Sequence, residues 1–403
     1  MTARVDAGIK EDMLEGRLRW RVARVARKGK GRRRGGWVGV LLALALCGVD
    51  PLPVAAASAG GVAPIPAPAG PPLKLEVPPK LRLLVVAPHP DDESLGAGGL
   101  MQQVLEKGGR VHVLFMTSGD GYPEAVALAT GHRQPTAADY RGFGELRRAE
   151  ALVALEHFHI LPLSVTFLGF PDGGLQEIWR RGPRVPAYES PFTHDDRPPY
   201  PEAFNPNARY TSRELIGQIA HLVALADPDW IALPTPLDTH PDHCATFTFI
   251  LAALKSLAAE PGGESKIPDR LLTYLVHDSR WPPLPSIPGP LPPPPQSFPP
   301  ARWYSLPLEA AQIDAKLGAL ESHRTQAAVM DLLFRALARS NEVFGVIERP
   351  EFGRLKPGEP ACGPEIVSHS APGTVPITVP SAPLPAPEAT PVAAARGTRV
   401  PVR

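Results

Sequence analysis

The chain has 403 residues, with 42 Lys and Arg against 41 Asp and Glu, and a formal net charge of +1. This length holds one large domain or two ordinary ones. The basic residues gather between residues 4 and 34, and a basic leader is no electrostatic footprint for nucleic acid, so we expect no nucleic acid partner. The 52 Pro and 36 Gly gather near the start, around residue 290 and at the end. These stretches lack the apolar periodicity of folded segments.

The N-terminal segment has the pattern of an export signal. Basic residues precede an apolar run at residues 37–49, and small residues follow at 55–60. This order predicts a secretory signal, and the run is short for a membrane span. The alternative is a retained N-terminal anchor, which would tether the protein to a membrane. We therefore expect residues 1–59 to be a signal peptide or anchor of an exported protein, and the Ala/Pro-rich residues 60–79 to be a linker.

Short apolar runs then alternate with helical patterns. Strands are expected at residues 81–87, 111–116, 165–168, 230–233 and 271–276, and helices at 93–107, 145–156, 212–226 and 246–258. This alternation predicts an α/β fold, a Rossmann-like doubly wound and mostly parallel sheet flanked by helices.

A single catalytic domain is expected over residues 80–355. It contains a Pro-rich loop at 282–300, after which Ile313, Leu317 and Leu320 have helical spacing. The Pro-rich tail at 356–403 is predicted to be disordered. Because Cys362 lies in that tail, Cys244 and Cys362 are expected to be unpaired thiols, although an export compartment would permit them to pair.

Two short segments combine His and Asp directly after predicted strands. The first reads P-H-P-D-D-E at residues 88–93, and the second reads T-H-P-D-H at residues 239–243. Ligands of doubly wound sheets bind at the carboxyl ends of the strands, where both segments are expected. Two imidazoles and one carboxylate satisfy the three protein ligands of a hydrolytic zinc site. A neighbouring carboxylate can then take a proton from the water that zinc activates.

Each segment also fits a structural role, since an Asp before a helix caps its first turn. The presence of both, each after a buried strand, favours a metal site. Residues 91–93 also suit a magnesium ion, which prefers oxygen ligands. His89 and His243 favour Zn2+ instead.

These residues resemble the PIG-L (LmbE-like) family of zinc-dependent N-deacetylases, whose signature is an A/P-H-P-D-D-E segment and a distant H-x-D-H. The resemblance covers about residues 80–345, and T-S-G-D-G at residues 117–121 agrees with it. It implies a role for each motif residue: the zinc ligands His89, Asp92 and His243, the general base Asp91, the carbonyl-polarising or acid residue His240, and Asp242, which tunes that histidine.

The resemblance also implies substrate contacts. Arg147 would reach sugar or phosphate oxygens, and the alternative is a surface ion pair with Glu150. Asp120 and Tyr122 follow the second strand, where Asp120 either lines the pocket or caps a turn. Some family members place a Tyr two residues before H-x-D-H as an oxyanion donor. This chain has Asp238 there, and Tyr122 is a candidate substitute.

We therefore expect a zinc-dependent hydrolase that removes an N-acetyl group from an N-acetylglucosamine-type sugar or glycoconjugate, with Asp91 activating the zinc-bound water. The alternatives are a non-catalytic glycan-binding module on the same fold, or another zinc amidase. Export favours an envelope polysaccharide, a glycolipid or an imported glycan as substrate.

Overall fold

The computed structural model describes residues 65–66, 71–183, 186–283, 289–298, 301–358 and 362. The predicted leader at 1–59 lies outside these residues, as does the predicted tail from 359 onward except for Cys362. Within the described ranges, no helix combines the length and the hydropathy needed to cross a membrane.

The core of the fold is an eight-stranded sheet with the order β2-β9-β10-β7-β6-β3-β4-β5. Strands β5, β4, β3, β6 and β7 are mutually parallel, whereas β10 runs antiparallel to both of its neighbours. The strands are β2 (Leu73–Lys74), β3 (Arg82–Ala87), β4 (Arg110–Thr117), β5 (Val165–Phe170), β6 (Trp230–Pro234), β7 (Arg270–Tyr274), β9 (Arg302–Pro307) and β10 (Asn341–Glu348). A separate two-stranded sheet pairs β1 (Ile65–Pro66) with β8 (Gln296–Ser297).

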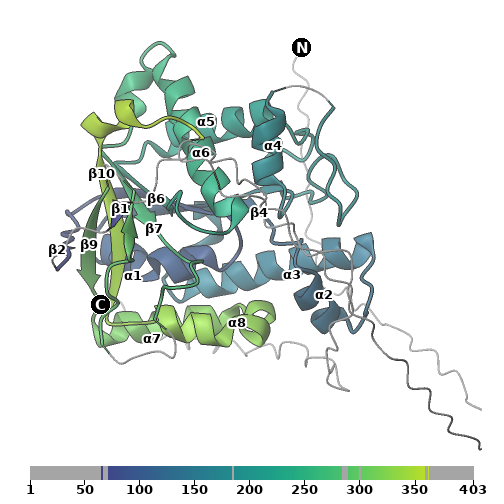
Figure 1. Ribbon diagram of the computed structural model, residues 1–403, viewed down its shortest axis with the longest axis horizontal. Helices are drawn as coiled ribbons and strands as arrows, with labels where there is room; N and C mark the ends of the chain where they lie inside the picture. Colours follow the sequence, from purple (N-terminus) through teal and green to yellow (C-terminus); the bar gives the residue numbers. More distant parts are fainter. Residues whose placement is uncertain are drawn as a thin grey trace, which may run out of the picture. The chain divides into compact units, whose positions relative to one another are not determined.

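Helices cover both faces of the large sheet (Figure 1). They are α1 (Asp92–Glu106), α2 (Pro123–Thr130), α3 (Ala137–Glu156), α4 (Leu175–Arg181), α5 (Ser212–Ala226), α6 (Pro241–Ala258), α7 (Ala310–Ser322) and α8 (Arg324–Leu337). Helices α1, α3 and α7 pack together on one side, and α4, α5 and α6 on the other. Successive side chains of β3 alternate between the two cores: Leu83 and Val85 join one, and Leu84 and Val86 join the other.

The predicted fold class is confirmed, and each of the five predicted strands overlaps an observed one. The sequence patterns did not indicate β9, β10, α2, α4 or α8. They also placed the start of α6 at Thr246, whereas the helix begins at Pro241, with His240 as its N-cap. Proline suits the first helical position because that residue's N–H has no intrahelical partner. The earlier start places His243 in the first turn of α6.

Two expectations about the chain outside the predicted core are wrong. Within the predicted linker, β2 pairs with β9, and Leu75 and Val77 are buried in the core. Cys244 and Cys362 form a disulfide, with their Cα atoms 5.6 Å apart. Part of the Pro-rich loop is also packed against the sheet, since Leu291 is buried and its N–H donates to the side chain of Asn341.

Candidate metal centre

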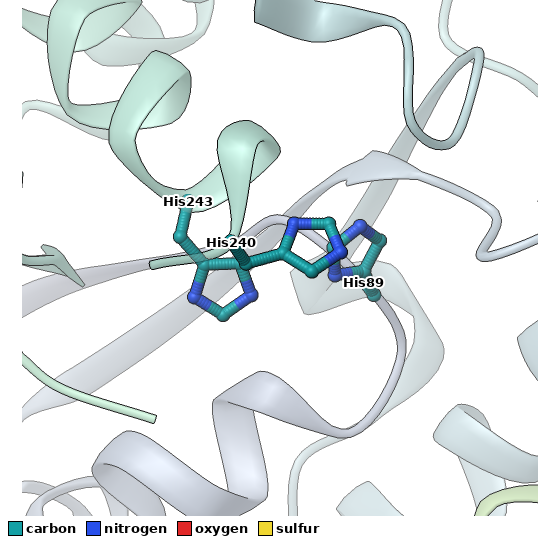
Figure 2. A group of neighbouring side chains, drawn as sticks. All are labelled: His89, His240 and His243. Atoms are coloured by element: carbon teal, nitrogen blue, oxygen red, sulfur yellow. The ribbon is translucent and has the colours of Figure 1, made fainter. Parts of the chain in front are cut away.

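The two His/Asp segments lie together at one edge of the sheet. Strands β3 and β6 are parallel neighbours, so the loops that follow them emerge side by side. His89 lies in the loop after β3, and His240 and His243 lie at the start of α6 (Figure 2). The ring centroids of His89 and His240 are 4.7 Å apart, and those of His240 and His243 are 5.1 Å apart.

Three sets of described His and Asp residues have ligand atoms within 4.8 Å of one another. They are His89, His240 and His243; Asp238, His243 and His277; and His89, Asp172 and Asp242.

Asp92 joins the two predicted histidine ligands directly. Its Oδ2 lies 3.1 Å from Nδ1 of His89 and 3.1 Å from Nε2 of His243. Ligand atoms about 2.0–2.2 Å from a tetrahedral zinc ion stand roughly 3.3–3.5 Å apart, so both separations suit adjacent ligands. Nε2 of His243 is buried and makes no hydrogen bond among the described residues. The donor set therefore fits a zinc ion.

The other nitrogen of each of these two imidazoles faces a carboxylate. Nε2 of His89 lies 3.1 Å from Asp172 Oδ1 and 3.3 Å from Asp242 Oδ2. Nδ1 of His243 lies 3.1 Å from Asp238 Oδ2. Metal-ligating histidines characteristically pair their second nitrogen with a carboxylate, which fixes the ring orientation and raises the basicity of the ligand. Both rings have this arrangement.

The negative charges also shift the ionisation of His243. Burial alone would lower the pKa of this imidazole, but Asp238 and Asp92 together raise that pKa to about 10. The field that holds a proton on this ring also favours a divalent cation beside it.

Asp238 stands two residues before the second motif, and its buried carboxylate points into the protein. Besides His243, it accepts hydrogen bonds from the amides of Val276, His277 and His240. Asp238 thus connects the start of α6 to the segment after β7. A carboxylate held in this way orients a ligand and has no proton to donate to an oxyanion.

His277 is a member of the cluster that the sequence motifs did not include. Its ring centroid lies 4.6 Å from that of His243 and 5.2 Å from that of His240, and its Nδ1 is 3.4 Å from Asp238 Oδ1. The available signal was its position, since His277 follows a buried strand as the two motifs do.

The backbone of Asp242, rather than its carboxylate, holds His240. The Asp242 N–H donates to Nδ1 of His240 over 3.2 Å, so in the neutral ring the proton lies on Nε2. The Asp242 carboxylate instead accepts hydrogen bonds from the amides of Gly173 and Leu175. Burial, together with the charges of His89 and His243, keeps the pKa of His240 well below its usual value.

Asp91 is held at the N-terminus of α1 by contacts on both sides. Its φ of 134° is unfavourable for a residue with a Cβ, so the surroundings must enforce it. Arg147 Nη2 lies 3.2 Å from Asp91 Oδ2, and the Asp91 N–H donates to Glu93. Glu93 in turn contacts Nε2 of His323 at 3.1 Å. Burial raises the pKa of the Asp91 carboxyl to about 6, although Arg147 opposes the shift.

Arg147 is buried and connects two loops of the site. Besides Asp91, its guanidinium donates to the carbonyls of Pro90 and Gly119. The alternative interpretation, a surface ion pair between Arg147 and Glu150, is wrong because both side chains are buried. Glu150 instead accepts hydrogen bonds from the amide and the hydroxyl of Thr325. A substrate contact of Arg147 stays a prediction.

The two other predicted substrate residues have different surroundings. Asp120 is buried and accepts a hydrogen bond of 2.5 Å from the hydroxyl of Tyr200. Burial and the charge of Asp172 raise the pKa of Asp120 to about 7. Tyr122 is partly buried and packs against a small apolar cluster that includes Tyr140. Their contacts with substrate stay predictions.

The fold and the His/Asp cluster define a candidate metal centre at the carboxyl edge of a parallel sheet. Residues 84–254, which contain both motifs, match the family described as GlcNAc-PI de-N-acetylase, PIG-L. This part of the chain is therefore similar to the PIG-L family.

Two curated relatives carry the name 1D-myo-inositol 2-acetamido-2-deoxy-alpha-D-glucopyranoside deacetylase. The protein of Kineococcus radiotolerans is 27% identical over 305 residues, which cover 69% of this chain and 78% of the relative. That of Segniliparus rotundus is 27% identical over 209 residues, covering 50% of this chain and 59% of the relative. Among solved structures, N,N'-diacetylchitobiose deacetylase from Pyrococcus horikoshii aligns with a TM-score of 0.42 and 17% identity, over 67% of this chain and 85% of that one.

Proposed function

We propose that this protein is a zinc-dependent hydrolase that removes the N-acetyl group from an N-acetylglucosamine-type sugar or glycoconjugate. The observation that carries the proposal is the contact of Asp92 with both His89 and His243, with Asp91 beside it in the sequence. The match of residues 84–254 to the PIG-L family and the names of the two relatives support the acetamido-sugar as the substrate class.

His89, Asp92 and His243 are the proposed zinc ligands. His240 belongs to the compact set with the same two histidines, so it is the competing third ligand. We favour Asp92 because one of its oxygens contacts a nitrogen of each histidine, and because two histidines with one carboxylate form a hydrolytic zinc site. Zinc bound there would supply Lewis-acid polarisation of the amide carbonyl and lower the pKa of a water molecule.

Asp91 is the proposed general base. Its carboxylate accepts the proton of the attacking water, whose oxygen bonds to the carbonyl carbon of the acetamide. Arg147 restricts the carboxylate through its 3.2 Å contact with Oδ2, and its bonds to the two loop carbonyls keep the guanidinium in place. The proton then passes to the amine nitrogen as the C–N bond breaks, releasing acetate and the free amino-sugar.

His240 is the proposed donor to the developing oxyanion. Because Nδ1 accepts a hydrogen bond from the Asp242 amide, the neutral ring carries its proton on Nε2, which can donate to the oxyanion. The low pKa of His240 is compatible with that neutral form. The role that some relatives give to a tyrosine would thus fall to the histidine of the second motif.

We also infer that the protein is exported, either released or tethered by its N-terminal segment. The charged and apolar leader supports this, as does the Cys244–Cys362 disulfide, since such bonds persist in oxidising compartments. Cell fractionation of the full chain tests the inference, and recovery of the protein in the cytosolic fraction alone would contradict it.

The decisive experiment combines metal analysis with an acetate-release assay on a panel of acetylated sugars. Metal-free protein should gain activity with Zn2+, and elemental analysis should find about one zinc ion per chain. Asp91→Asn should lower kcat by about 10²- to 10⁴-fold and keep the zinc. Asp331→Asn, which alters an exposed carboxylate on α8, is the matched control.

Each alternative has its own signature in these measurements. Full activity of Asp91→Asn, or activity that requires Mg2+ rather than Zn2+, would rule out the proposed mechanism. Saturable sugar binding without turnover would indicate a glycan-binding module. Turnover restricted to amides other than acetylated sugars would indicate another zinc amidase.

A further inference from the structure

The backbone of Asp91, the proposed general base, depends on a side chain for support. A residue with a Cβ keeps a φ of 134° only where its surroundings hold it there. The Asp91 carbonyl accepts hydrogen bonds from the amides of Ser94 and Leu95, as in any first turn of a helix. The Asp91 amide instead donates to Oε2 of Glu93 over 2.9 Å. The orientation of this amide is therefore tied to the Glu93 side chain.

Glu93 is in turn held by a distant segment of the chain. Its Oε1 accepts a hydrogen bond from the Ser94 hydroxyl and lies 3.1 Å from Nε2 of His323, which is 230 residues away in sequence. His323 stands at the junction of α7 and α8. Glu93 is 0% exposed and His323 is 1% exposed, so neither side chain can touch a substrate. Any effect of these two residues on hydrolysis must pass through Asp91.

Helix α3 holds both Asp91 and the α7–α8 junction. Arg147 on this helix contacts the Asp91 carboxylate. One turn later, Glu150 accepts hydrogen bonds from the amide and the hydroxyl of Thr325, at the start of α8. Two routes from α3 therefore converge on Asp91: the first reaches its carboxylate, and the second reaches its amide through His323 and Glu93.

This support separates the directions of two adjacent carboxylates. Asp91 faces Arg147, whereas Asp92 faces His89 and His243. We propose that His323 and Glu93 are positioning residues of the hydrolase: His323 orients Glu93, and Glu93 fixes the Asp91 backbone so that its carboxylate faces the attacking water rather than the metal. The inference rests on the proposed function for the role of Asp91. Small displacements of a reacting group are costly, since about 1 Å can lower a rate by roughly 100-fold.

The test uses two pairs of variants and a matched control. Glu93→Met removes the acceptor, and Glu93→Gln keeps an oxygen for the Asp91 amide. His323→Leu removes the donor to Glu93, and His323→Gln keeps an N–H donor near the position of Nε2. His157→Gln is the control, because the exposed His157 contacts the Ser322 hydroxyl beside the same junction.

Activity is measured as acetate release by the zinc-loaded full chain. Glu93→Met and His323→Leu should lower kcat by about 10- to 100-fold, because the base is displaced. They should change KM and the zinc Kd less than about twofold, since neither residue contacts substrate or a zinc ligand in the proposal. The two Gln variants should keep kcat within about threefold of the unsubstituted protein, and His157→Gln should match it. Circular dichroism should show all five variants folded.

A double-variant cycle separates positioning from general support of the fold. If Glu93 acts through the Asp91 carboxylate, Glu93→Met should cause no further loss of kcat in protein that already carries Asp91→Asn. If Glu93 supports the site in another way, Glu93→Met should lower kcat by the same factor in both backgrounds.

Hydrogen exchange of the Asp91 amide gives a readout that needs neither zinc nor turnover. In metal-free protein with isotope-labelled aspartate, this amide should exchange at least about tenfold faster in Glu93→Met and His323→Leu. In the two Gln variants its exchange should remain slow. The Asp229 amide, which donates to the Arg82 carbonyl, is the internal reference and should not change.

Three results would overturn the inference: full kcat in Glu93→Met and His323→Leu, an equal loss in the Gln variants, or unchanged exchange of the Asp91 amide. The proposed function is judged separately, from acetate release by the unsubstituted protein. Faster exchange without any acetate release would refute the hydrolase and keep the hold of Glu93 and His323 on Asp91. Acetate release that these variants leave unchanged would refute the positioning and keep the hydrolase.

Discussion

Oδ2 of Asp238 lies 3.1 Å from Nδ1 of His243, while Nε2 of the same ring faces Asp92 at the same distance. The imidazole thus lies between two carboxylates. Asp92 is a proposed zinc ligand, and Asp238 lies on the opposite side of the ring. Three backbone amides fix the outer carboxylate. The arrangement specifies which nitrogen of His243 remains available as a ligand.

Asp238→Asn should therefore weaken zinc affinity by about 10- to 100-fold, the usual effect of removing an outer carboxylate. The amide cannot supply the negative charge that makes His243 a stronger ligand. Competition with a zinc chelator of known affinity measures the change. Asp196→Asn, which alters a surface ion pair, is the control. An unchanged zinc Kd for Asp238→Asn would show that Asp238 does not act through the metal ligand.

Much of the site is predictable from the sequence because its main signals are local. A buried strand is a continuous apolar run, and the residues directly after it fall at the ligand-binding edge. The sequence alone therefore predicts that His89 and His243 lie at the same edge of the sheet. Their loops are separated by about 150 residues in sequence, and the parallel pairing of β3 with β6 places them together.

The relationships that the sequence did not reveal depend on contacts between distant segments. Asp238 and His277 meet because β6 and β7 are neighbours, and nothing near either residue indicates the partner. The same holds for the disulfide, since Cys362 reaches Cys244 only through a return of the chain after β10. The segment 341–348 forms an antiparallel strand, which the alternation of strands and helices does not predict.

The Cys244–Cys362 disulfide should stabilise the fold, because it closes a loop across a sequence separation of 118 residues. Disulfides typically contribute about 2–4 kcal/mol to the free energy of unfolding. Cys362→Ser should lower the free energy of unfolding by about that amount. Urea denaturation measures it, and reduced unsubstituted protein should match the variant. If oxidised protein and Cys362→Ser unfold at the same urea concentration, the bond does not contribute.

A buried ion pair connects α7 and β10 to the backbone of α1. Lys316 Nζ donates hydrogen bonds to the Leu95 carbonyl and to the Glu342 carboxylate. Glu342 also accepts hydrogen bonds from the amides of Gly99 and Leu100. Lys316→Met should cost about 3–5 kcal/mol, because it leaves Glu342 buried without a countercharge.

The double variant Lys316→Met/Glu342→Leu should be more stable than Lys316→Met alone. The second substitution removes the buried carboxylate that Lys316→Met leaves without a countercharge, so part of the lost stability should return. Urea denaturation of the two single variants and the double variant gives the coupling energy. Additive losses would show that Lys316 and Glu342 do not stabilise each other.

Asp120 should make the free energy of unfolding decrease as the pH rises. A carboxylate in a salt bridge has the opposite effect. Its pKa in the folded protein is about 7, above the ordinary value of 3.8 for an aspartate, because burial disfavours the charged form. The folded chain therefore binds more protons than the unfolded chain between about pH 4 and 7. The contribution of Asp120 is fully present below about pH 4 and is lost as the pH rises through 7.

Asp120→Asn removes this dependence, and its amide oxygen can still accept the Tyr200 hydroxyl. We compare the free energy of unfolding of the variant with that of the unsubstituted protein. This difference should change in favour of the variant by up to about 4 kcal/mol as the pH rises from 4 to 8, at roughly 1.4 kcal/mol per pKa unit. Urea denaturation of metal-free protein at the two pH values measures the difference. Tyr200→Phe, which removes the donor to Asp120, should retain the slope with pH. A variant whose relative stability is the same at both pH values would show that Asp120 is ionised throughout.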